Sequence, residues 1–189
     1  MESTWTDVSA PYLTPRTGPR SDAWAEEAAA QGRRGTQKLR EVGEVLPPSD
    51  VARALGLGDG ESAIVRRRTM FLDDQPFELT DSYYPLAVAS GTPLAEPRKV
   101  RGGAPTVLAN LGRRPHRIRE DVSTRPATDE ERVLLELDDM QWVLILFRTA
   151  MAEDGTPIEV SVMTMVPTNR RLTYELNLWR AGVPNYALA

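Results

Sequence analysis

The chain has 189 residues, of which 41% are hydrophobic and 26% charged, and its formal net charge at pH 7 is −4. This composition fits a globular protein with one well-packed domain, and the acidic balance argues against a surface that binds nucleic acid. With no cysteine and one histidine, His116, the sequence excludes disulfides, thiolate zinc sites and cysteine nucleophiles, so we expect no metal site and no cofactor.

The two ends of the chain are expected to lie outside the domain. Residues 1–21 are rich in proline, which is typical of an extended lead-in rather than a packed element. Residues 22–180 form the predicted domain, and residues 181–189 form a C-terminal tail. No apolar run is long enough to cross a membrane, and no signal-peptide core follows Met1, so we expect a cytoplasmic protein without membrane contact.

Between these ends, short helices alternate with strands. Ser21 and Asp22 offer an N-cap for the first helix, and Gly32 is placed to end it. In chain order, the predicted elements are helix 23–30, strand 36–45, helix 49–55, strand 62–72, strand 77–84, helix 107–112 behind a glycine pair, strand 114–125, helix 128–135, strand 142–152, strand 158–166 and strand 171–178.

The most informative feature is an internal repeat of a helix and a hairpin. The order helix, strand, turn, strand of residues 49–85 recurs in residues 128–167. Matching positions are Leu55 with Leu135, Arg68 with Arg148, and Glu78 with Glu159. Two such hairpins predict one antiparallel sheet with helices on one face, hence an α+β fold of about six strands.

The same stretches carry a family resemblance. The turn Asp73-Asp74-Gln75-Pro76, the strand end Ser82-Tyr83-Tyr84-Pro85, the helix start Ala127-Thr128-x-Glu130-Glu131 and the run Asp154-Gly155-x-Pro157-Ile158-Glu159 occur in this order. Over about residues 22–178 the chain resembles the UTRA domain, the effector-binding half of HutC-type GntR transcriptional regulators, with a chorismate-lyase-like fold. The resemblance implies a small-molecule effector and a homodimer.

Regulators of this kind normally begin with a winged helix-turn-helix that reads operator DNA. Only the proline-rich lead-in precedes the domain here, so we expect no DNA-reading module and no direct DNA binding by this chain. A truncated regulator and a standalone UTRA protein both remain open.

A helix that begins after two glycines is the first candidate binding site. Gly102, Gly103, Ala104 and Thr106 lie where unpaired backbone N–H groups and a partial positive charge favour a phosphate, sulfate or carboxylate. An ordinary loop-to-helix junction is the alternative.

Charged residues of the repeat are the second candidate. Arg66 and Arg68 share one face of their strand, while Arg67 points to the other. An inward arginine suits an anionic ligand, and Glu159 suits a ligand hydroxyl or amine. Solvated charges on a strand edge, and an ion pair of Glu159 with Arg68, are the alternatives.

Further candidates follow from the resemblance. Met70, Thr80 and Met165 stand where phosphosugar sensors tend to have arginine, glutamate and tyrosine, so the resemblance implies an effector with one anionic group and an apolar part. Ser161 and Met163 share a face with Met165, and Trp24 falls where the family places an aromatic residue near the ligand. The methionines and Trp24 are also suited to an ordinary core.

Two other functions remain open. A chorismate-lyase-like enzyme would share the fold, but fold is a poor guide to activity, and we expect no enzyme. A ligand-free dimerisation module would have its pocket filled by Trp24, Met163 and Met165.

Overall fold

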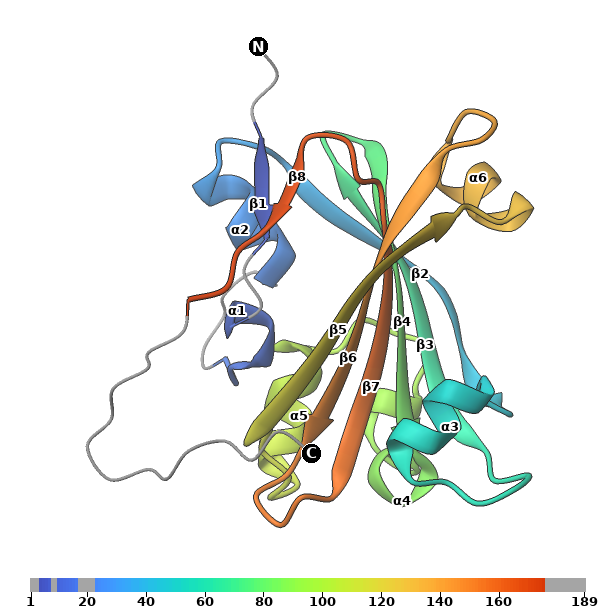
Figure 1. Cartoon of the computed structure of the whole chain (residues 1–189). Helices are drawn as coiled ribbons and strands as arrows, with labels where there is room; N and C mark the ends of the chain where they lie inside the picture. The colour runs from blue at the N-terminus through green and yellow to red at the C-terminus, as the bar shows by residue number, and fades with distance from the viewer. Residues whose placement is uncertain (1–3, 8–9, 17–22, 176–189) are drawn as a thin grey trace.

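A computed structural model describes residues 4–7, 10–16 and 23–175, and its centre is a twisted six-stranded antiparallel sheet (Figure 1). The strand order is β2-β3-β4-β7-β6-β5. These strands are β2 (Gly35–Val45), β3 (Ala63–Leu72), β4 (Gln75–Pro85), β5 (Arg117–Pro126), β6 (Trp142–Met151) and β7 (Pro157–Met165). The predicted α+β class and the six-stranded sheet are therefore confirmed.

The internal repeat organises this sheet. The hairpins β3–β4 and β6–β7 join through β4 and β7, where Asp81 pairs with Val162. The repeat helices α3 (Ser49–Leu55) and α6 (Asp129–Leu135) lie on one face of the sheet, as predicted, with α3 against β7 and α6 against β4. Because each helix covers a strand of the other half, neither half has a complete core alone.

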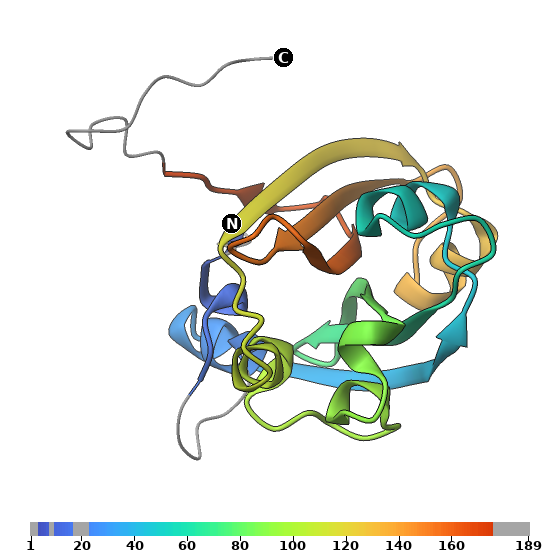
Figure 2. The ribbon, with the colours of Figure 1, turned by 90° about the horizontal axis from the view of Figure 1, so that it is seen from below.

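The opposite face carries four further helices. They are α2 (Ala23–Ala30), α4 (Leu86–Ala89), η1 (Pro93–Ala95) and α5 (Gly103–Asn110). Figure 2 shows α2 in blue and α5 in yellow-green on one side, and α3 in teal on the other. Two apolar clusters cover this second face. One contains Tyr84, Leu94 and Leu108, and the other contains Trp24 and Met70.

The N-terminal segment packs against the domain, so the expectation of an unpacked lead-in is wrong for its described residues. β1 (Trp5–Asp7) pairs in parallel with β8 (Arg170–Leu172), and α1 (Ala10–Leu13) follows. Trp5 is only 3% exposed, because its ring packs 5.2 Å from that of Trp24 and 5.6 Å from that of Phe77. Large aromatic surfaces of this kind stabilise the docked segment.

The last predicted strand is also different. Instead of a strand over 171–178 in the main sheet, the structure has the short β8, which pairs only with β1. Residues 176–178, the expected N-cap at Ser21 and Asp22, and the tail 181–189 lie outside the described residues. Within the described part of the chain, no helix is long and apolar enough to span a membrane.

The contact between α2 and β2 gives a first prediction. A Cβ on Gly35 would lie 2.8 Å from the carbonyl oxygen of Trp24 and 2.8 Å from Cβ of Ala28. We therefore expect Gly35→Ala to lower the free energy of unfolding by about 1–3 kcal/mol, because backbone has to move. Gly43→Ala, on the same strand with no atom within 4 Å, is the matched control. Equal urea midpoints for the two variants would refute this close packing.

Candidate functional site

A cavity of about 200 Å³ lies on the sheet face between the two apolar clusters. Strands β3, β4, β6 and β7 supply its floor, and α2, the α1 segment and the start of α5 supply its walls. Most of the residues predicted from the sequence lie around it: Trp24, Arg66, Arg68, Met70, Thr80, Gly102, Gly103, Ala104, Glu159, Ser161, Met163 and Met165.

Thr106 is the predicted residue that does not line the cavity. Its hydroxyl donates to the carbonyl oxygen of Gly102 at 2.7 Å and accepts from the backbone N–H of Arg16 at 2.9 Å. Gly102 has φ 73°, and a Cβ there would lie 2.9 Å from the Thr106 hydroxyl, so this position requires glycine. Thr106 thus fixes the start of α5 and ties the N-terminal segment to it.

Arg66 supports the cavity wall through backbone contacts. Its guanidinium donates to the carbonyl oxygens of Leu94, Glu96 and Arg98 at 2.9, 2.8 and 2.7 Å. Burial lowers the pKa of Arg66 from its usual value, although the group remains a cation at neutral pH. Its hydrogen bonds hold the segment that leads from η1 to α5.

Arg68 begins a chain of polar contacts across the cavity floor. Its Nη2 donates to Ser82 Oγ at 3.1 Å, the hydroxyls of Ser82 and Ser161 lie 2.8 Å apart, and Ser161 donates to Glu159 Oε1 at 2.7 Å. Arg68 Nε is buried, and no described residue accepts a hydrogen bond from it. The expected alternative, a direct ion pair between Arg68 and Glu159, does not form; two serine hydroxyls stand between them.

Two further charged pairs at the floor escaped the sequence analysis. Glu78 accepts from Thr80 at 2.7 Å and lies 3.2 Å from Arg170, which also pairs with Asp7 at 2.9 Å. Burial raises the pKa of Glu78, and the charge of Arg170 opposes that rise.

Arg148 pairs with Glu120 at 2.5 Å, and both side chains are about nine-tenths buried. The internal repeat was the available signal for Arg148 and Glu78, because their counterparts Arg68 and Glu159 were already candidates.

Part of the wall is apolar and lies beside the buried phenol of Tyr84. Met163, Met165 and Leu146 form a small cluster beside the sheet, and Met70 lies next to Trp24. Burial raises the pKa of Tyr84 far above its usual value, Glu159 raises it further and Arg68 opposes the rise. Tyr84 therefore stays protonated between these two charged groups and keeps its hydroxyl available as a donor.

The N-terminal segment closes one side of the cavity with Asp7, Tyr12, Thr14 and Arg16. Tyr12 donates to Glu27 and Arg16 pairs with Glu26, so polar contacts hold this segment to α2. Sequence reasoning missed all four residues, because nothing in a proline-rich stretch indicates which distant helix it will contact.

The other face of the sheet has a second hollow, between α3 and α6. Arg67, predicted to point away from Arg66 and Arg68, lies here. Its guanidinium and that of Arg40 both reach Asp81, at 2.7 and 3.0 Å. These charges are therefore paired within the protein. Among the described residues, no cluster of three His, Cys, Asp or Glu side chains could hold a metal ion.

Comparisons with known proteins agree with this architecture. A sequence model described as the UTRA domain matches residues 30–169. The chain is 30% identical over 161 residues to an uncharacterized HTH-type transcriptional regulator of Streptomyces coelicolor, covering 82% of this chain and 60% of that relative. The chain therefore spans only 60% of the length of this curated relative.

Solved structures show the same fold. The effector domain of PhnF from Mycobacterium smegmatis superposes with a TM-score of 0.70 at 19% identity, covering 82% of this chain and 94% of that one. A GntR-family transcriptional regulator from Bacillus cereus superposes with a TM-score of 0.62 at 18% identity, covering 77% and 98%. The chorismate-lyase-like fold predicted from the sequence is confirmed.

Proposed function

Since the chain belongs to the UTRA domain family, we propose that its cavity binds a small-molecule effector and that it is a sensing domain of HutC-type transcriptional regulation. The effector has one anionic group and an apolar part. The protein acts in the cytoplasm as a homodimer and binds its effector without converting it, and the UTRA domain described here does not itself contact DNA.

One observation carries the proposal: the cavity is open and contains a cation without a counter-ion. Trp24, Met163 and Met165 line the cavity and leave it open. A ligand-free dimerisation module would instead have its pocket filled by these three side chains. Arg68 forms no ion pair with any described residue, and the N-terminus of α5 opens onto the same space. A forked guanidinium and a helix N-terminus both favour an anionic group.

The apolar part of the effector is argued from the methionines. Met70, Met163 and Met165 present flexible, polarizable side chains that adapt to an apolar ligand. We propose binding rather than catalysis because the hydroxyls and carboxylates of the floor are hydrogen-bonded to one another, and because His116 is exposed and does not line the cavity.

A thermal-shift screen of small carboxylates and phosphates, with and without an apolar part, tests the function. A ligand at about 100 times its Kd stabilises by about 2.7 kcal/mol, so we expect a rise in Tm of about 5–10 °C. Arg68→Gln is expected to abolish that rise.

Two comparisons sharpen this test. Glucosamine-6-phosphate, which is polar throughout, is expected to give a smaller shift than anions with an apolar part. The control variant Lys38→Gln, at an exposed position of β2, should respond like the wild type. If no compound raises Tm, or if Arg68→Gln responds fully, effector binding at this site is refuted.

A further inference from the structure

The internal repeat places the same three polar groups on the cavity floor twice. Register and sequence equate Arg68 with Arg148, Glu78 with Glu159, and Thr80 with Ser161. In both halves the hydroxyl donates to the glutamate at 2.7 Å, from Thr80 to Glu78 and from Ser161 to Glu159. The cavity floor is thus pseudo-symmetric in its chemistry as well as in its strands.

Ion pairing breaks this symmetry. One arginine and one glutamate, taken from different halves of the repeat, have counter-ions within the protein: Glu78 is paired with Arg170 at 3.2 Å, and Arg148 with Glu120 at 2.5 Å. These partners come from β8 and β5, which lie outside the repeat unit. Glu78 and Arg148 therefore need no counter-ion from a ligand.

The equivalent residues Arg68 and Glu159 have no such counter-ions. Neither Arg68 nor Glu159 forms an ion pair with any residue in the described part of the chain, yet both line the cavity. They sit on β3 and β7, separated by the hydroxyls of Ser82 and Ser161 through hydrogen bonds of 3.1, 2.8 and 2.7 Å. Both residues are half-buried, and Arg68 Nε is buried without an acceptor among the described residues. A partly desolvated charge without a partner favours a ligand that supplies one.

We propose that the effector is amphoteric: an anionic group binds Arg68, and a protonated amine or a comparable donor binds Glu159. The methionines of the wall contact an apolar spacer between the two ends. This inference rests on the proposed function and narrows it, because an effector with an anionic group alone would leave Glu159 uncompensated.

Stability in the absence of ligand is the first test, with the repeat supplying matched controls. Arg68→Gln and Glu159→Gln should leave Tm within about 2 °C of the wild type or raise it, because each removes an uncompensated charge. Arg148→Gln and Glu120→Gln each break a buried pair and should lower Tm by about 10 °C.

The double variant Arg68→Gln/Glu159→Gln should also keep or exceed the Tm of the wild type. Its shift need not be the sum of the two single shifts, because one chain of hydrogen bonds links the two residues. A fall in Tm for Arg68→Gln or Glu159→Gln that equals the controls would overturn the inference by making the pair structural.

Ligand binding is the second test, using 5-aminopentanoate against its two halves, pentanoate and pentylamine. We expect 5-aminopentanoate to raise Tm more than either half, and Glu159→Gln to reduce its effect to that of pentanoate. An equal shift from pentanoate, no shift from 5-aminopentanoate, or an unchanged response of Glu159→Gln would each overturn the amphoteric ligand. The thermal-shift screen of carboxylates and phosphates distinguishes failure of this inference from failure of the proposed function. A purely anionic compound that stabilises the wild type through Arg68 would support the proposed function even if the amphoteric ligand is refuted.

Discussion

Replacing Arg170 by alanine is expected to lower the free energy of unfolding by about 3–5 kcal/mol. The Arg170 side chain is fully buried, lies 2.9 Å from Asp7 and 3.2 Å from Glu78, and places its guanidinium 3.9 Å from the ring centroid of Phe77. Without this cation, two carboxylates are left together in a site that excludes water. Breaking a buried pair in this way is among the more damaging single changes in a protein.

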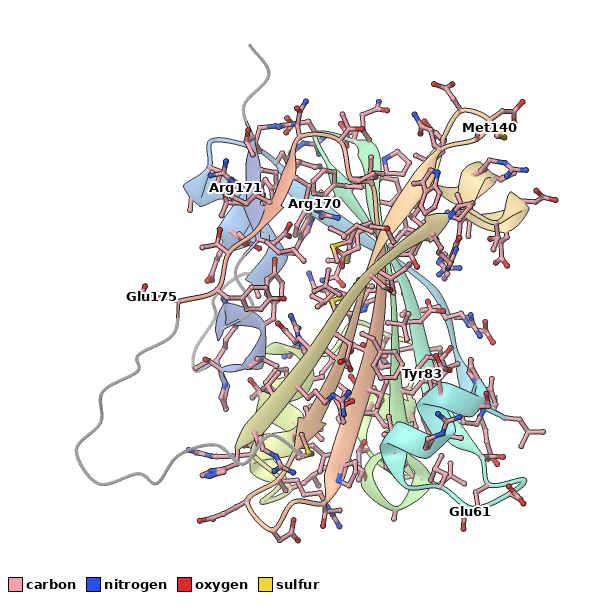
Figure 3. All side chains as sticks on the ribbon, in the orientation of Figure 1. Glu61, Tyr83, Met140, Arg170, Arg171 and Glu175 are labelled. Carbon is pink, nitrogen blue, oxygen red and sulfur yellow. The ribbon has the colours of Figure 1, made fainter. Side chains whose placement is uncertain are left out.

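Urea denaturation of the two neighbouring variants measures the effect. Arg171→Ala is the matched control, because Arg171 follows Arg170 on β8 but is exposed; Figure 3 labels both residues. We expect the control to stay within about 0.5 kcal/mol of the wild type. Similar midpoints for the two variants would show that the Asp7–Arg170–Glu78 cluster does not hold β1 and β8 to the sheet.

The pH dependence of the Arg170→Ala variant adds a sign to this prediction. Burial already raises the pKa of Glu78, and loss of Arg170 removes the main influence that lowers it. A carboxyl whose pKa is raised in the folded state contributes stability below its unfolded pKa and loses it as the pH rises through the folded pKa. The deficit of the variant should therefore be smaller at about pH 5 than at about pH 7.5.

The strands of the sheet, and the face to which each side chain points, were predictable from local sequence patterns. The repeat of helix, strand, turn and strand is a sequence-local feature, and it specified both hairpins of the central sheet. Because side chains alternate along a strand, the assignment of Arg66 and Arg68 to one face and Arg67 to the other followed directly. Both assignments agree with the structure.

The partners of those side chains were not predictable in the same way. The counter-ion of Arg148 comes from β5 and that of Glu78 from β8, and the sequence carries no pattern that links such distant positions. For Trp5, the packing partner on α2 is reached only when the N-terminal segment folds back over the sheet. Tertiary contacts between remote segments therefore account for what the sequence analysis missed.

Arg66 shows the same limit, because its partners are backbone carbonyls that no residue type reveals. Its guanidinium donates to the carbonyl groups of Leu94, Glu96 and Arg98, which run from η1 toward α5. This segment continues through Lys99 and Val100, which line the cavity, to the start of α5. The cavity wall on this side depends on one side chain of β3.

We expect Arg66→Met to lower the free energy of unfolding by about 3 kcal/mol or more, because hydrogen bonds to charged groups contribute about 1.5–3 kcal/mol each and the carbonyls of Leu94 and Arg98 lose the guanidinium that donates to them. The methionine keeps the apolar stem but none of the donors. Urea denaturation measures the loss. Limited proteolysis with trypsin shows where the variant opens, because Arg98, Lys99 and Arg101 are cleavage sites within the segment that Arg66 holds.

Cleavage of the folded variant in this segment should be at least about tenfold faster than in the wild type, because local opening controls proteolysis. Arg66→Lys is the informative second variant: it keeps the charge, but a compact ammonium group cannot reach three separate carbonyls as a planar fork does, so cleavage should stay fast. Arg53→Met, at an exposed position of α3, is the control for loss of an arginine.

Because the freed segment also forms the wall beside Gly102, effector-induced stabilisation should fall together with protection from trypsin. A variant that loses one and keeps the other would separate the wall from the binding site.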